Sequence, residues 1–592
     1  MWGDQCQSRT MHVVCGVRKA ARVVTVLILL PVCLSASSNV HVLPSKTILP
    51  GCSRSPIYAT PILKALKLRC GSQTRESNPI ATPSISHQLI RGGSTTIPPS
   101  KIESKKTPND DAAIDEKVIS PVFPIFKSEI PQFVNMSLMM FFLIYVFTTT
   151  RDVKDALVVP HCGAESVPFL KLYGAMPSAA LFILVYSKLS NILSRDKLFY
   201  ATLVPFFCFY GIFGFVLFPL RDKIHFSFGG DAAVVSGGIR EVALSLLNSW
   251  SFSLYFIVSE LWASVSIPLL FWQCANEITK LDQAQRYYPL FAVFGNFAPI
   301  LSGKIMSSIV ALQETNDDTG FGLTLRILTG IKVILGMGIC VFYRLVYKNS
   351  SVDTMSEARE QAPQSKEKKK QSLKESIHEL SNNSELRSIA TIVFCYYSCL
   401  EFTEVLWKGI LRKQYPSKST YMLFMGNFSQ VVGWCAVILQ ILAPHIIRGV
   451  GWKGASLLVP LSMGVLAMPF FACVSLSEKL DIPIRITFLI GTAQSVINKI
   501  SKYALFDPLK EMAYIPLGHD AKVKGKAAVE LMGSKLGKSY GSATQQILVV
   551  VMGGTILRCA PALGMLYILG IFVWSRSVLS LGKMFEVADA SS

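Results

Sequence analysis

Charged residues are scarce in this chain, and their scarcity argues against a soluble globular protein. Only 16% of the 592 residues are Asp, Glu, Lys or Arg, whereas 51% are hydrophobic and the mean hydropathy is +0.42. Soluble domains contain about 25% charged residues. The composition therefore predicts an all-α polytopic membrane protein. The net charge of +20 does not indicate a nucleic-acid partner, because the sequence lacks a soluble domain that carries a basic stripe with interleaved aromatic residues.

Motifs for metal binding and catalysis are lacking as well. The fourteen cysteines are scattered singly, and the nearest pair, Cys395 and Cys399, lies in an apolar run, so neither a disulfide framework nor a zinc site is predicted. The eight histidines are dispersed, and the sequence has neither a His-Glu-x-x-His pair nor a nucleophile elbow. The run from Gly533 to Ser539 is one residue too short for a phosphate-binding loop and lies in an apolar segment. We therefore predict that the chain is not an enzyme and needs no metal or cofactor.

The first hundred residues have the composition of targeting signals. Residues 1–37 combine basic residues, a short apolar stretch and small residues, which is typical of a secretory signal peptide. Residues 38–100 are rich in Ser, Thr and Pro with one acidic residue, as in a transit peptide. Together they predict a plastid envelope protein of an alga with a complex plastid; the alternative is a disordered tail. Ser38 is not the aromatic residue that such leaders usually have after cleavage, so the bounding membrane stays open.

Twelve apolar segments follow a polar lead-in at residues 101–131, and each is long enough to cross a membrane as a helix. They lie at residues 132–159, 167–190, 197–220, 247–275, 287–311, 325–348, 387–411, 420–447, 453–476, 482–503, 526–553 and 557–580.

A hydrophilic linker at residues 349–386 divides these segments into two six-helix halves, residues 132–348 and 387–580, and residues 581–592 form a tail. This organisation is typical of a two-repeat secondary transporter whose binding site lies between the halves. Two complete halves make a monomer sufficient. The positive-inside rule places the linker and both termini on the cytosolic or stromal side, where the loops contain Lys or Arg near Lys188, Arg195, Lys197, Lys280, Arg286 and Lys499.

The first apolar segment ends in the charged run Thr150 to Asp155. A lone Lys or Arg at the bilayer centre costs about 2.5–3.5 kcal/mol, so these charges need partners if the helix continues through them. Arg151 and Asp155 are four residues apart and can neutralise one another on one helical face, which leaves Lys154 to face another group. The alternative is that the helix ends near Thr150 and the run is a hydrated loop.

Two further acidic residues lie inside apolar segments, Glu260 in the fourth and Glu404 in the seventh. Buried carboxylates of this kind face a cavity, pair with a base or carry protons. Lys408 follows Glu404 by four residues and is its local partner if the role is structural.

The eleventh segment contains Gly533, Gly537 and Gly541 at four-residue spacing, a pattern that lets another helix approach closely. Lys535 and Lys538 lie on other faces, and we expect Lys538 to face a cavity. Gly295, Pro299 and Gly303 form a parallel in the fifth segment.

These basic residues predict an anionic substrate. Lys154, Lys526 and Lys538, with Arg151 and Arg286 in reserve, supply enough positive charge to a water-filled cavity to bind a polyphosphate. Among the aromatic residues, Tyr145, Trp262 and Trp407 are candidates to stack on a base, although packing is the commoner role.

Several strings in this region resemble the ATP/ADP translocases of plastids and obligate intracellular bacteria, over about residues 120–580. They are Thr150-Arg151-Asp152-x-Lys154-Asp155, Cys162-Gly163-Ala164-Glu165, Pro168-Phe169-Leu170-Lys171, Glu260-Leu261-Trp262, Leu270-Phe271-Trp272, Arg286-Tyr287-Tyr288-Pro289-Leu290-Phe291, Phe424-Met425-Gly426-Asn427-Phe428-Ser429 and residues 505–526.

The resemblance implies a twelve-helix carrier, distantly like the major facilitator fold, that exchanges ATP for ADP or other nucleotides across a plastid membrane. It places the family's functional charges at Lys154, Glu260, Glu404 and Lys538, and it adds Asn427 as a site candidate. The chain departs from the family at Gly518-His519-Asp520 and at Tyr540, which leaves nucleotide preference open.

Two alternatives to nucleotide exchange are retained. One is a broad-range or proton-coupled importer of ribo- or deoxyribonucleoside triphosphates, with Glu260 or Glu404 as the proton carrier. The other is a nucleotide sensor or scaffold that acts through the linker and does not transport.

Overall fold

The computed structural model describes residues 124–228, 239–279, 281–313, 318–349, 380, 383–477, 479–514, 517 and 529–591. The predicted signal peptide, the transit-like segment, most of the lead-in and nearly all of the linker lie outside these residues. Every regular element in the described ranges is helical. The predicted all-helical membrane fold is therefore confirmed.

The first half of the chain forms helices that overlap each of its six predicted segments. These are α2 (Ile130–Cys162), α3 (Ser166–Phe169) continued by η4 (Leu170–Ala175) and α4 (Met176–Ile192), α5 (Arg195–Ile212) with η5 (Phe213–Leu217), α8 (Trp250–Val265) with η7 (Ser266–Phe271) and α9 (Trp272–Ile278), α10 (Leu281–Gly295) with α11 (Phe297–Ala311), and α12 (Asp318–Asn349). The short helices α6 (Arg221–Ile224) and α7 (Ile239–Asn248) connect the third and fourth segments. We call this set the first half.

The second half consists of α15 (Ser384–Gln414), α16 (Lys418–Leu476), α17 (Ile484–Ser501) with η8 (Lys502–Phe506) and α18 (Asp507–Met512), η9 (Glu530–Lys535) with α20 (Leu536–Met552), and η10 (Ile556–Cys559) with α21 (Ala560–Ser591). At about 1.5 Å per residue, the 59 residues of α16 are far too long for one crossing of a roughly 30 Å hydrocarbon core. The chain reverses within α16 at Gly451, whose φ of 71° favours glycine. Thus α16 supplies both the eighth and the ninth predicted segments.

Nine helices in the described ranges are long and apolar enough to cross a membrane. The segments built on α17 and α20 are absent from these nine, although the sequence predicts both as spans. Both carry lysines toward one end of an otherwise apolar stretch, Lys499 and Lys502 in one, Lys535 and Lys538 in the other. Their polarity has a structural reason, because these lysines line a cavity.

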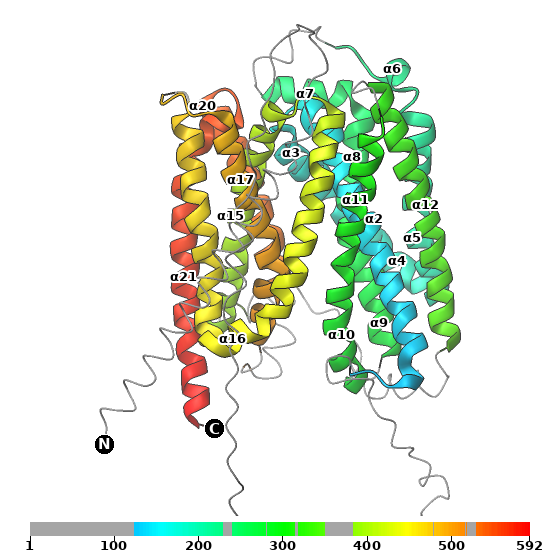
Figure 1. Ribbon diagram of the computed structural model, residues 1–592, viewed down its shortest axis with the longest axis vertical. Helices are drawn as coiled ribbons and strands as arrows, with labels where there is room; N and C mark the ends of the chain where they lie inside the picture. The colour runs from blue at the N-terminus through cyan, green and yellow to red at the C-terminus, as the bar shows by residue number, and fades with distance from the viewer. Residues whose placement is uncertain are drawn as a thin grey trace, which may run out of the picture. The chain divides into compact units, whose positions relative to one another are not determined.

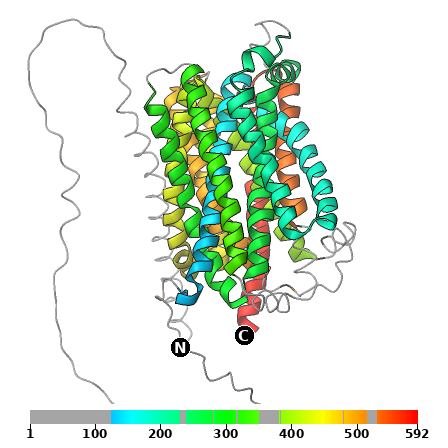
Figure 2. The ribbon, with the colours of Figure 1, turned by 90° about the vertical axis from the view of Figure 1, so that its right-hand side faces the viewer.

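The helices of the two halves run side by side, with the first half blue to green and the second half yellow to red (Figure 1). The view turned by 90° shows the same parallel arrangement (Figure 2). Within the first half α2 packs on α8, α11 and α12, and within the second half α15 packs on α17, α20 and α21. The halves meet where α11 and α2 pack on α16 and where η4 packs on α20.

Glycines permit the closest of these contacts. A Cβ at Gly537 would lie 2.7 Å from the carbonyl oxygen of Phe394, and one at Gly541 would lie 2.6 Å from the Cβ of Glu401. The glycine stripe of the eleventh segment thus packs against α15, which confirms the predicted close approach. Between the two halves, α11 contacts α16 where Gly303 meets the backbone of Gly426.

Substitution of Gly303 by alanine is expected to weaken the contact between the halves. Its new methyl group would overlap the Gly426 carbonyl oxygen and lie 2.9 Å from the backbone nitrogen of Gln430, and backbone atoms cannot move aside as a flexible side chain does. Overpacking of this kind costs about 1–3 kcal/mol. We expect a lower thermal unfolding temperature in detergent, measured by size-exclusion chromatography after heating. Gly330→Ala is the matched control, since a Cβ there meets nothing within 4 Å; equal effects of the two changes would contradict the prediction.

Candidate functional site

A cavity of about 890 Å³ lies between the two halves. This volume is within the range of about 300–1,000 Å³ that is usual for small-molecule sites. The first half contributes side chains from α2, η4, α4 and α8, and the second half contributes side chains from α15, α17, η8, η9 and α20. A site formed by both halves is the arrangement that the predicted two-repeat transporter requires.

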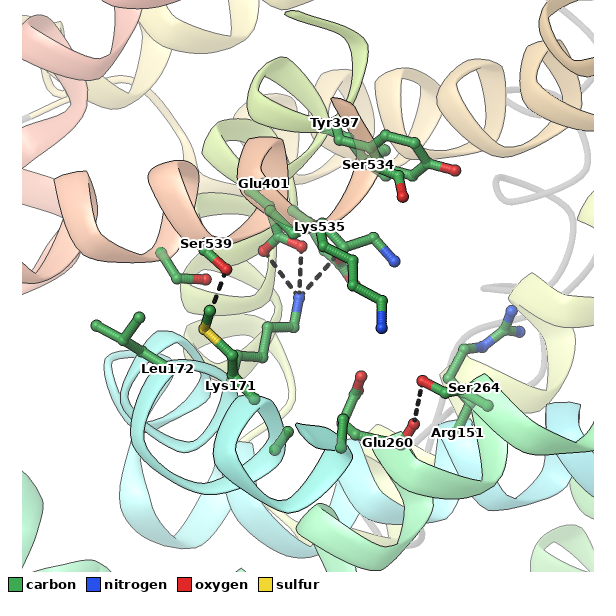
Figure 3. A pocket seen from close by; sticks show the side chains of 18 of the residues that line it. Arg151, Lys171, Leu172, Glu260, Ser264, Tyr397, Glu401, Ser534, Lys535 and Ser539 are labelled. Carbon is green, nitrogen blue, oxygen red and sulfur yellow. Dashed lines mark hydrogen bonds and ion pairs between the residues drawn. The ribbon is translucent and has the colours of Figure 1, made fainter. Parts of the chain in front are cut away.

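Positive charge predominates in the lining of this cavity. Among the described residues, seven basic side chains and three acidic side chains line it: Arg151, Lys154, Lys171, Lys499, Lys502, Lys535 and Lys538, with Glu260, Glu401 and Glu404. Figure 3 shows Glu401 and Lys535 on one side of the cavity and Glu260 and Arg151 on the other, with the side chain of Lys171 reaching from η4 toward Glu401. The excess of basic groups favours an anionic ligand.

The first part of an ion-pair chain runs from α8 through α2 to α15. Lys154 Nζ lies 3.0 Å from Glu260 Oε1 and 2.9 Å from Asp155 Oδ1, and 4.0 Å from the centre of the Phe256 ring. The other oxygen of Asp155 lies 3.0 Å from Lys408 Nζ. The predicted helix therefore continues through the charged run, and the hydrated-loop alternative is wrong: Asp155 is 2% exposed and α2 extends to Cys162.

The second part of the chain runs back from α15 to η4. Lys408 Nζ lies 3.0 Å from Glu404 Oε1, four residues earlier, which confirms the expected local pair. Lys171 Nζ lies 2.8 and 3.0 Å from the two oxygens of Glu401 and 3.5 Å from Glu404 Oε2. The complete order is Glu260, Lys154, Asp155, Lys408, Glu404, Lys171 and Glu401, so that acidic and basic groups alternate and the chain passes between the halves.

Three lysines in the second half have a different environment. Among the described residues, no carboxylate oxygen is found in an ion pair with Lys499, Lys535 or Lys538, whereas each of the other four basic residues of the lining has such a partner. Lys538 Nζ lies 5.0 Å from the centre of the Tyr397 ring, and Lys499 Nζ 5.1 Å from that of Phe428. We call Lys499, Lys535 and Lys538 the lysine triad. It is the part of the cavity best suited to bind an added anion.

The predicted pair between Arg151 and Asp155 is not formed. Arg151 Nε lies 3.1 Å from Asp152 Oδ1, and Arg151 also donates a hydrogen bond to Ser429 Oγ on α16. Asp155 is engaged by Lys154 and Lys408 instead. The local spacing allows the pair, but tertiary partners on α15 and α16 compete for both side chains.

Other site candidates lie away from the cavity. Arg286 makes two contacts of 2.6 and 2.8 Å with the carboxylate of Glu129, the residue directly before α2, and does not line the cavity. Asn427 accepts a hydrogen bond from Gln430 and is also not in the lining. Lys526 lies outside the described residues, as does the Gly518-His519-Asp520 segment.

Of the three aromatic candidates, one lines the cavity and two do not. Trp407 reaches the cavity wall, whereas Tyr145 and Trp262 are buried elsewhere, and Trp262 packs on Phe206 and Phe207. Tyr540, which the resemblance marks as a departure, packs against Phe394 and is absent from the lining. Tyr397 and Tyr503 do face the cavity, and nothing in the sequence singles them out.

Four charged residues of the lining are missed or misplaced when only the sequence is read. Lys499 is expected in a loop on the basic side, but it lies within α17. Lys171 and Lys502 lie in η4 and η8, both of which are π-helices, and Lys502 pairs with Asp507 at 2.8 Å. Glu401 precedes Glu404 by three residues, so its place on the same helical face is a usable signal.

Comparison with known proteins identifies a family and several relatives that match most of the chain. The model of a family described as "TLC ATP/ADP transporter" matches residues 109–585. The chain is 35% identical over 491 residues to the "ADP,ATP carrier protein 1, chloroplastic" of Arabidopsis thaliana, covering 81% of this chain and 77% of that one. It is also 35% identical to the "ADP,ATP carrier protein 1" of Chlamydia pneumoniae, covering 80% and 95%, and to the "Plastidic ATP/ADP-transporter" of Solanum tuberosum, covering 78% and 76%.

Similar solved structures are more distant. A bacterial homologue of the iron transporter ferroportin, in its inward-facing state, has a TM-score of 0.49 at 13% identity and covers 75% of this chain and 99% of its own. The D-xylose-proton symporter has a TM-score of 0.46 at 14% identity, with 76% and 96% covered. At these scores the two likenesses say nothing further about the chain. The family model and the three carriers suffice: this chain belongs to the TLC ATP/ADP transporter family.

Proposed function

We propose that this protein is a nucleotide antiporter that exchanges ATP for ADP across a plastid envelope membrane by alternating access. The observation that carries the proposal is the lysine triad in a cavity between the two halves, where basic side chains outnumber acidic ones. Relatives that are named as ADP,ATP carriers, including plastidic ones, support the same substrates. In this scheme the lysine triad binds the phosphate chain, and the Glu260-to-Glu401 ion-pair chain connects binding to movement of the halves.

The lysines suit a carrier better than a tight receptor. A lysine ammonium is a compact point charge on a flexible stem, so it holds a phosphate without the fixed bidentate geometry of arginine. A carrier has to release its ligand on the opposite side, which requires binding that is favourable without being deep. Lys154, Glu260 and Glu404, for which the resemblance implies transport roles, all belong to the ion-pair chain.

The experiment that tests the proposal is exchange in proteoliposomes. Purified protein is reconstituted, liposomes are preloaded with ADP, ATP, other nucleoside triphosphates or deoxynucleotides, and uptake of labelled ATP is measured. We expect uptake only into liposomes that contain a nucleotide, with ADP and ATP most effective. Failure to accumulate label with every internal nucleotide would sink the proposal, and equal uptake without any internal nucleotide would favour an importer instead.

We further propose that the protein acts as a monomer in an envelope membrane of a complex plastid. The two halves supply a complete cavity within one chain, which supports a functional monomer. The composition of the leader at residues 1–100 supports a location in the complex plastid of an alga. Plastidic relatives support the coarser location.

Tyr503 is expected to stack on the nucleobase. It lines the cavity, the residue is 38% exposed, and it lies on η8 directly after Lys502, whose ammonium is 4.8 Å from the centre of its ring. Stacking of a base on an aromatic ring contributes about 1–3 kcal/mol. We therefore expect Tyr503→Leu to raise the half-saturation concentration for ATP about 5- to 150-fold, whereas Tyr503→Phe retains the ring and the affinity.

Inorganic tripolyphosphate serves as the control for this prediction, because it has phosphates and no base. Its inhibition constant for ATP exchange should be the same in wild-type protein and in Tyr503→Leu. Equal losses for ATP and tripolyphosphate would contradict a stacking role for Tyr503.

A further inference from the structure

We propose that the contacts of Lys171 with Glu401 and Glu404 form a lock between the two halves, which the phosphates of the substrate have to open before the carrier can reorient. This inference rests on the proposed nucleotide exchange and explains why exchange would be obligatory. Lys171 belongs to the first half, on η4, and both carboxylates belong to the second half, on α15. Figure 3 shows the ammonium group of Lys171 directed at Glu401 across the space between η4 and α15.

The geometry of the lock is tight. Lys171 Nζ lies within 3.0 Å of both oxygens of Glu401 and 3.5 Å from Glu404 Oε2. The side chain of Glu401 is 2% exposed and that of Lys171 is 15% exposed. Because so little water reaches the pair, its separation without replacement partners would leave a carboxylate and an ammonium group unpaired in the interior, which is strongly unfavourable.

The lock lies where the halves have to separate. Glu401, Glu404 and Lys408 follow each other at three and four residues on one face of α15, and each of them contacts a charged side chain of the first half. Farther along, Glu165 Oε1 of the first half accepts a hydrogen bond of 2.9 Å from the backbone N–H of Ile556 in the second half. Helix α3, which follows Glu165, lies at the end of the molecule opposite the C-terminus (Figure 1). Separation of the two halves along this face of α15 therefore requires the lock to break.

A polyphosphate can supply what the broken lock loses. Lys171 lines the same cavity as the lysine triad, so a phosphate oxygen held by the triad can take the place of Glu401 on Lys171. Glu401 in turn lines the same cavity as Lys538. When substrate is bound, Lys171 and Glu401 thus exchange one ionic partner for another. In the empty carrier the same two groups lose their partners without replacement. Only the loaded carrier then reorients quickly, and the result is one-for-one exchange.

The test compares net efflux with exchange in the same proteoliposomes. Liposomes loaded with labelled ATP are diluted into buffer without nucleotide or into buffer with ADP. For the wild-type protein we expect efflux into ADP to be at least about 100-fold faster than efflux into plain buffer, which is the order of the penalty for breaking one buried ion pair. Glu401→Gln is expected to raise efflux into plain buffer at least about tenfold, because it removes that penalty in part. Exchange is expected to be lower than in the wild type but measurable, because Glu404 still contacts Lys171.

Glu129→Gln is the matched control. It also removes the carboxylate of a partly buried ion pair, that with Arg286, but this pair joins α10 to the residue directly before α2, so it does not connect the two halves, and it lies outside the cavity. The ratio of exchange to net efflux should stay at the wild-type value in this variant. A charge reversal, Lys171→Glu with Glu401→Lys, rebuilds the contact between the halves and should restore the high ratio that Glu401→Gln loses.

The possible outcomes distinguish a failure of the proposed function from a failure of the lock. Absence of exchange in wild-type protein with every nucleotide overturns the function itself. Wild-type efflux into plain buffer as fast as exchange, or efflux from Glu401→Gln at the wild-type rate, overturns the lock alone. Loss of exchange in both Glu401→Gln and the charge reversal also overturns it, because a lock is not needed once substrate is bound. A similar fall in the ratio for Glu129→Gln shows that any lost ion pair loosens the carrier, and likewise rejects the proposal.

Discussion

Exchange is expected to fall at least about 100-fold when Lys154 is replaced by alanine. The ammonium group lies 2.9 Å from Asp155 and 3.0 Å from Glu260, and its side chain is 5% exposed. Removal of one partner from a buried ion pair costs about 3–5 kcal/mol, and each step of about 1.36 kcal/mol corresponds to a tenfold change. The substitution also makes the ion-pair chain more acidic at the place that an anionic substrate has to approach.

Initial rates of ATP uptake into ADP-loaded proteoliposomes measure this effect. Lys154→Arg keeps the charge but replaces a compact ammonium with a planar group, so we expect it to retain a measurable part of the activity. Thermal unfolding in detergent shows whether Lys154→Ala still folds. Uptake by a folded Lys154→Ala close to the wild-type rate would rule out a role for this lysine in transport.

Loss of the lysine triad is expected to have the second large effect, and it should grow with the number of phosphates. Hydrogen bonds to charged groups contribute about 1.5–3 kcal/mol each, so a single change to alanine at Lys499, Lys535 or Lys538 should raise the half-saturation concentration for ATP about 10- to 150-fold. The triple variant should lose saturable uptake. The half-saturation concentration should rise more for ATP than for ADP, and more for ADP than for AMP, because a nucleotide with fewer phosphates contacts fewer of these lysines.

Competition by ATP, ADP and AMP against labelled ATP provides the measurement. Lys479→Ala is the matched control, since this exposed lysine of the second half is not in the lining of the cavity, and its competition constants should match the wild type. Equal shifts for the three nucleotides in the triad variants would show that the lysines do not bind the phosphate chain.

Charges inside apolar segments are the part of the site that can be predicted from the sequence. Glu260 lies near the middle of a long apolar run, and Lys154 and Glu404 lie nearer the ends of theirs. The penalty for burying a charge in a bilayer is enough to mark all three as candidate site residues. The structure brings Lys154 into direct contact with Glu260 and joins both to Glu404 through Asp155 and Lys408.

Partner choice is the part that cannot be predicted in this way. Asp155 meets Lys408 across 253 positions of the chain, and a helical spacing rule has no information on such distant groups. Arg286 illustrates the same limit, because its partner Glu129 belongs to a segment that the sequence assigns to a polar lead-in. Local spacing indicates which ion pairs are possible, and tertiary packing determines which of them form.

Position along a helix is misjudged from the sequence for basic residues near the ends of apolar segments. Lys499 and Lys502 resemble flanking charges because hydropathy falls after Ile500, but α17 continues without a break through η8 into α18. The helix therefore carries both lysines along the cavity wall. Continuity of a helix through a polar stretch depends on whether the stretch faces water in a cavity, and that is a property of the assembled bundle.

The π-helices have an evolutionary consequence. Of the five in the described ranges, η4, η8 and η9 each contribute residues to the cavity. A π-helical turn arises when an α-helix accommodates one extra residue, and one residue corresponds to a rotation of about 100° around the helix axis. Gain or loss of a single codon in these segments would thus present a different set of side chains to the substrate, while the remaining turns of the same helix kept their packing. Relatives with different substrates can therefore be expected to differ here in length as well as in sequence.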